Sequence, residues 1–84
     1  MKISEDQITT VNATQLLEQG VAAIRGGDAV VDLSQVARVD SSAVALLLAF
    51  KREAVERNIA LQFQAMPKAL ASLASLYGVD TLLT

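Results

Sequence analysis

Three adjacent polar residues, Asp40, Ser41 and Ser42, form the group in this sequence that is best placed to do chemistry. They directly precede an unbroken apolar run, residues 43–50, which is rich in helix formers, so they are expected to begin a helix. The first turn of a helix leaves backbone N–H groups unpaired and carries a partial positive charge. We therefore expect this corner of the chain to hold or respond to an anion.

The residues that common enzyme mechanisms require are missing around this group. The sequence contains neither histidine nor cysteine, which removes the commonest general base, the commonest metal ligand and thiolate chemistry. Asp32 and Asp40 could form a carboxylate pair for acid–base work or for a metal, but no third carboxylate lies near them in the chain. We favour the alternative in which they tie down a loop and cap a helix. Ser41 and Ser42 lack a base to activate them as nucleophiles, and a helix cap is a sufficient role for Ser41. The prediction is therefore no enzyme, no cofactor and no metal.

Composition limits the class of protein further. The 84 residues suffice for one small domain, residues 1–84, and 52% of them are hydrophobic while only 4% are aromatic. So much apolar material in so small a core suggests a surface for a partner. The net charge of −2 without a basic run argues against nucleic acid and against an anionic membrane surface. The longest apolar run has eight residues, far below the roughly 20 that span a bilayer, and no signal peptide is visible, so we expect a cytosolic protein without direct membrane insertion.

Hydrophobic periodicity predicts the order of elements. Apolar runs bounded by turn residues predict strands at residues 29–33 and 59–65, and residues 1–10 form one ragged edge strand or none. Helical spacing predicts helices at residues 13–25, with Asn12 opening a capping box, and at residues 42–58, and a third helix with Pro67 at its first position. Strands alternating with helices predict an α/β domain, with a mostly parallel central sheet and about three helices packed on it.

The predicted helix over residues 42–58 carries an unexpected outward patch. Steps of 100° per residue place one set on its core face: Val44, Leu47, Leu48, Ala54 and Val55. The other side of its first half carries small or apolar residues where charge is expected: Ser42, Ala45, Leu46 and Ala49. This patch is either covered by the N-terminal segment or free to bind a partner. We favour a docking face with Leu46 as its anchor, because small side chains let another backbone approach closely. Arg38, Arg52 and Glu53 would form its polar rim.

Residues 31–48, VDLSQVARVDSSAVALLL, resemble the signature of STAS domains, named for sulfate transporters and anti-sigma-factor antagonists. In that signature a strand ends in Asp-Leu-Ser, and a loop then leads to Asp-Ser-Ser-Gly or Asp-Thr-Ala-Gly at the start of an apolar helix. Ala43 stands here in place of the usual Gly. Residues 67–83 are similar to the C-terminal part of one branch, the small cytoplasmic STAS subunit of the bacterial Mla phospholipid-transport ABC system.

This resemblance implies a protein that binds the ATPase subunit of a phospholipid-transport ABC complex and stabilises or regulates it. Such a complex maintains outer-membrane lipid asymmetry, and the chain would associate peripherally with the inner membrane through its partner. By position, Ser41 matches the residue that is phosphorylated in anti-sigma-factor antagonists. One alternative is therefore an antagonist switched by phosphorylation of Ser41, with a kinase or an anti-sigma factor as its partner. Another is a nucleotide-binding domain, as suggested for some STAS proteins.

Overall fold

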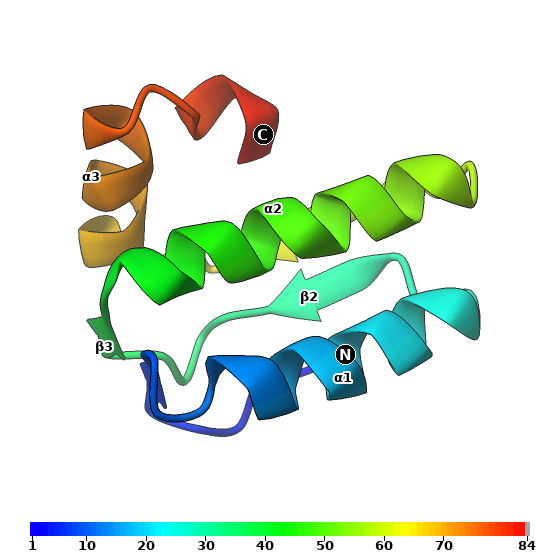
Figure 1. Cartoon of the computed structure of the whole chain (residues 1–84), viewed down its shortest axis with the longest axis horizontal. Coiled ribbons are helices and arrows are strands. Elements are labelled where there is room, and N and C mark those ends of the chain that lie inside the picture. The colour runs from blue at the N-terminus through cyan, green and yellow to red at the C-terminus, as the bar shows by residue number, and fades with distance from the viewer. Residues whose placement is uncertain (84) are drawn as a thin grey trace.

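The computed structural model describes residues 1–83 and confirms the predicted α/β class with three helices. Four short strands accompany them in this part of the chain, and a 3₁₀ turn, η1, ends it (Figure 1). In chain order the elements are β1 (Gln7–Ile8), α1 (Ala13–Arg25), β2 (Val30–Asp32), β3 (Arg38–Val39), α2 (Ser41–Glu56), β4 (Gln62–Gln64), α3 (Lys68–Leu76) and η1 (Asp80–Leu83). None of these helices is long and apolar enough to cross a membrane.

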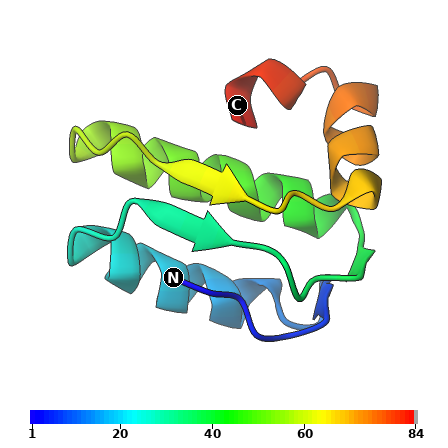
Figure 2. The same cartoon turned by 180° about the vertical axis from the view of Figure 1, so that it is seen from behind.

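The strands pair in parallel, as predicted, but they form two separate pairs. β2 pairs with β4, with Val31 opposite Phe63, and β1 pairs with β3, with Ile8 opposite Val39 (Figure 2). For residues 1–10 the sequence allowed one edge strand or none, and β1 is that strand. β3 was not predicted, because two residues carry too little periodicity to indicate a strand.

Helices α1 and α2 lie side by side and cover one face of the β2–β4 pair (Figures 1 and 2). Gly20 makes this close approach possible, since a Cβ atom at that position would lie 2.2 Å from the ring of Phe50. Phe50 is completely buried. Gly20 therefore marks the point of close packing between α1 and α2.

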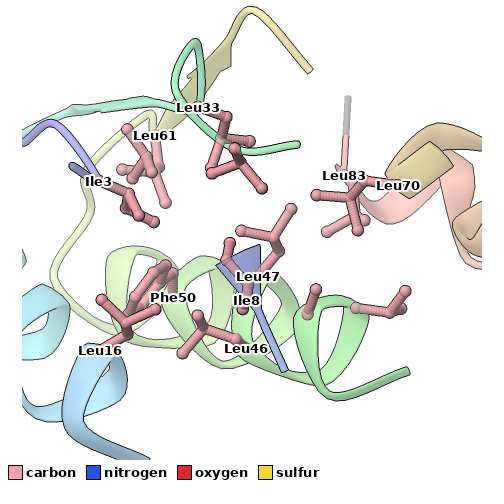
Figure 3. Close-up of a cluster of buried hydrophobic side chains, with 14 of the residues drawn as sticks. Ile3, Ile8, Leu16, Leu33, Leu46, Leu47, Phe50, Leu61, Leu70 and Leu83 are labelled. Atoms are coloured by element: carbon pink, nitrogen blue, oxygen red, sulfur yellow. The ribbon is translucent and has the colours of Figure 1, made fainter. Parts of the chain in front are cut away.

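The buried side of α2 differs from the predicted core face. It comprises Ala43, Val44, Leu46, Leu47, Phe50 and Ala54. Leu46, which we expected to point outward, is only 4% exposed and belongs to the cluster of buried side chains that Figure 3 draws. Leu48 and Val55, which we expected in the core, are half-buried and exposed, respectively. The reason is that α2 packs most extensively against α1, which turns its buried arc toward Leu46 and Phe50.

The ends of the helices follow the predicted signals in part. The capping box at Asn12 is wrong, because its side chain makes no cap bond. Its oxygen instead accepts from the Thr9 N–H (3.0 Å) and its amide donates to the Gln7 carbonyl (2.9 Å). α3 starts directly after Pro67, and Gly78 follows it with a φ of 72° that suits glycine. After Gly78 the chain forms η1 from Asp80 to Leu83, a segment for which the sequence predicted no element, and Thr84 lies outside the described residues.

Candidate protein-binding site at the start of helix α2

Asp40 holds the start of α2 and the preceding loop in place. One carboxylate oxygen accepts the backbone N–H of Ser42 at 2.8 Å, which caps the helix. The other accepts the N–H of Thr10 at 3.2 Å, from the loop before α1. The backbone N–H of Asp40 in turn donates to the carbonyl of Ile8 at 3.3 Å. The structure thus confirms the cap and the loop tie for Asp40, and so brings the starts of α1 and α2 together.

The same contacts set the ionisation of this corner. Burial would raise the pKa of Asp40, but the hydrogen bonds from Ser42 and Thr10 outweigh it and hold this pKa below its usual value. Asp32 likewise ties a loop, because it accepts the N–H of Ser34 at 2.8 Å, and that bond lowers its pKa. The carboxylates are therefore engaged in local structure. Within residues 1–83, no three acidic side chains lie close enough together to hold a metal ion.

Ser41 is free of the capping role. It is the first residue of α2, it is exposed, and its hydroxyl has no hydrogen-bond partner within residues 1–83. The interpretation of Ser41 as the helix cap is therefore wrong, since Asp40 performs that function. Ser42 is half-buried beside it. The rigid cap thus presents one unbonded hydroxyl to solvent at the positive end of a 16-residue helix.

A row of small and apolar side chains continues from Ser41 along the solvent side of α2. We call Ser41, Ala45, Leu48, Arg52 and Val55 the outer stripe of α2. Their spacing of three and four residues places them on one helix face. All are exposed except Leu48, which is half-buried. No charged residue of this stripe occurs before Arg52, so its first half could let another protein approach closely.

Next to the outer stripe, α1 covers most of the patch that we predicted as a docking face. Ala49 is half-buried and only Ala45 is exposed, while Leu46 is buried and cannot anchor a partner. A groove of about 240 Å³ remains between the two helices. It is lined by Ala13, Thr14, Leu17, Ser42, Ala45, Leu46 and Ala49. The covering N-terminal segment, the alternative that we did not favour, is thus correct for Leu46 and partly for Ala49.

The three residues predicted to form the polar rim lie in different surroundings. Arg38 is exposed in β3, two residues before Asp40, and Arg52 is exposed on the outer stripe. Glu53 instead binds Arg57 (Nε–Oε2 2.8 Å) and Arg25 (Nη2–Oε1 3.5 Å), and its side chain is only 13% exposed. Hydrogen bonding by Arg57, which outweighs burial, lowers its pKa. Glu53 therefore links α1 to α2 and is not available as a rim.

Fold and site together define a small STAS-like domain, in which parallel strands position a helix whose capped start faces solvent. Residues 5–84 match the family described as "Mlab, STAS domain", and the chain belongs to this family. The resemblance noted in the sequence is thereby confirmed. A search of curated proteins found no match.

Proposed function

We propose that this chain is a non-enzymatic cytoplasmic subunit that binds the ATPase of a phospholipid-transport ABC complex and stabilises or regulates it. Membership of the Mlab, STAS domain family supports a role beside an ABC system. The complex would maintain outer-membrane lipid asymmetry, and the chain would reach the inner membrane only through its partner.

One observation carries the proposed contact surface. Because Asp40 caps α2, the Ser41 hydroxyl remains exposed and unbonded within residues 1–83, at the head of an outer stripe that stays uncharged as far as Arg52. A rigid, small-residue helix start allows a partner to approach closely at little cost in conformational entropy. In this proposal Ser41 and Ala45 form the centre of the contact, and Arg38 and Arg52 lie at its rim.

Binding to the purified cognate ATPase, measured by calorimetry, tests this surface. Ser41→Glu and Ala45→Arg each place a large charged side chain on the exposed stripe, and each should weaken binding about tenfold or more. Ser4→Glu, at an exposed serine of the N-terminal segment, is the matched control and should bind like wild type. Circular dichroism should show an unchanged fold for all three. Absence of a wild-type complex would overturn the proposed function, and unaltered affinity of both stripe variants would overturn the proposed surface.

The exposure of Ser41 also favours a second candidate, an anti-sigma-factor antagonist that a partner kinase phosphorylates. A phosphate there would add close to two negative charges beside the positive end of α2, but also beside the Asp40 carboxylate. Intact mass spectrometry of the protein from its native cells separates the candidates. A phosphate on Ser41 supports the antagonist, whereas unmodified protein that co-purifies with the ATPase supports the transport subunit.

A further inference from the structure

Further along α2 from Ser41, the helix and the C-terminal 3₁₀ turn form an open groove that the sequence did not indicate. We call it the α2–η1 groove. Its apolar wall consists of Leu48 and Val55 from α2 and Leu82 from η1, and its volume is about 550 Å³. Figure 1 shows η1 above the middle of α2. Val55 is 65% exposed and Leu82 56%, so two large apolar side chains from separate elements face water in one groove.

Charged side chains surround this apolar wall unevenly. Lys51, Arg52 and Glu56 also line the groove, which gives two cations and one carboxylate in a chain of net charge −2. The Lys51 ammonium donates to the Leu61 carbonyl at 3.3 Å, so its stem runs along the edge of the core. Arg52 forms no ion pair within residues 1–83, although Glu56 lies one turn away. A binding partner that supplies a carboxylate here would complement the excess of positive charge.

Arg52 shares its lack of an ion pair with Arg38 within residues 1–83, whereas Arg25 and Arg57 are both paired. Arg57 and Arg25 both pair with Glu53, on the side of α2 that faces α1. The Arg25 pair joins α1 to α2, and the Arg57 pair lies within the last turns of α2. Arg52 lies on the other side, beside exposed apolar side chains, and its guanidinium keeps all five donors for a ligand outside the described residues.

We propose that the α2–η1 groove receives an apolar segment of the ATPase subunit that places a carboxylate beside Arg52. This inference rests on the proposed function and specifies a second part of the same interface. Two observations support it, namely the charge complementarity and the continuity of the surface. Leu48, Arg52 and Val55 continue the outer stripe that begins at Ser41, and from residue 41 to residue 55 it runs about 21 Å at 1.5 Å per residue. One partner surface of standard size covers such a length.

Two groove variants and two matched controls test this proposal against the purified ATPase. Val55→Asp places a charge on the apolar wall and should weaken binding about tenfold or more. Arg52→Glu should weaken it about fivefold or more at low salt, and the loss should shrink at high salt because the ion pair is screened. The controls are Val11→Asp, at a valine that is 83% exposed before α1, and Lys2→Glu, at an exposed lysine. Both controls should bind within about twofold of wild type, since neither residue lines the groove.

The possible outcomes separate this inference from the proposed function. If the wild-type complex forms and both groove variants bind like their controls, the groove proposal is overturned and the proposed function stands. If Val55→Asp weakens binding and Arg52→Glu does not, the proposal that the ATPase segment places a carboxylate beside Arg52 is overturned. If no wild-type complex forms, both proposals fall. Light scattering of the chain alone tests a different occupant: a concentration-dependent dimer that Val55→Asp abolishes would assign the groove to a second copy of this chain.

Discussion

The two sides of helix α2 carry similar residues in different surroundings. On the side that faces α1, Leu46 and Phe50 are buried, and Glu53 is held between two arginines. On the outer stripe, Val55 is exposed, and Arg52 has no ion-pair partner within residues 1–83. An apolar or a charged residue of α2 therefore supports the fold or remains available for binding according to the element beside it.

This difference arises because different elements lie beside the two sides of α2. The inner side packs against α1. Because Gly20 of α1 has no side chain, the two helices approach closely and the ring of Phe50 fills the space beside it. The outer side borders the short η1 turn, which leaves a groove beside it. Substitutions on the two sides should therefore separate stability from binding.

The largest expected effect on stability comes from a matched pair of leucines. Leu46→Ala should lower the free energy of unfolding by about 2–5 kcal/mol, since it removes a buried side chain and leaves a cavity. Leu82→Ala, at a leucine that is 56% exposed, should change it by no more than about 0.5 kcal/mol. Urea denaturation followed by circular dichroism measures both values.

The loss in Leu46→Ala could exceed what so small a domain tolerates, so a milder variant accompanies it. Leu46→Met keeps the volume and should cost less than about 1.5 kcal/mol. Equal losses in Leu46→Ala and Leu82→Ala would contradict the division of α2 into a buried and an available side.

A smaller effect is expected where α1 and α2 touch. In Gly20→Ala the new methyl group meets the buried Phe50 ring, and overpacking of this kind costs about 1–3 kcal/mol. The higher helix propensity of Ala offsets about 1 kcal/mol of that cost. A double-mutant cycle with Phe50→Leu isolates the contact, because Gly20→Ala should be neutral or stabilising once the ring is gone. The same loss in both backgrounds would show that Gly20 matters for another reason.

Local signals in the sequence sufficed for much of the fold and for part of the site. Strand β2, helix α2 and the capping role of Asp40 all follow from residue types within a few positions of one another. The parallel pairing of β2 with β4 follows from the alternation of strands and helices.

Contacts between distant segments decided what the sequence could not predict. The buried arc of α2 depends on α1, so a helical projection of α2 alone placed Leu46 outside and Val55 inside. The α2–η1 groove needs Leu82, which lies 27 residues beyond Val55 and had no predicted element around it. One signal was present, since Ser41, Leu48 and Arg52 recur at helical spacing. It was missed because Leu48 was assigned to the core.

The smallest expected effect concerns the capped start of the outer stripe and depends on pH. Hydrogen bonds from Ser42 and Thr10 outweigh the effect of burial and hold the pKa of Asp40 below its value in the unfolded chain. The ionised carboxylate therefore stabilises the fold fully above the unfolded pKa, and this contribution is lost as the pH falls through the folded pKa.

Asp40→Asn keeps a side-chain oxygen that can cap the helix but removes the charge. Its melting temperature should lie below that of wild type at pH 7, and the gap should close in acid. Asp40→Ala, which also loses the cap, should remain less stable than Asp40→Asn at every pH. A gap between wild type and Asp40→Asn that persists at pH 2 would show that charge at the helix start is not what Asp40 contributes.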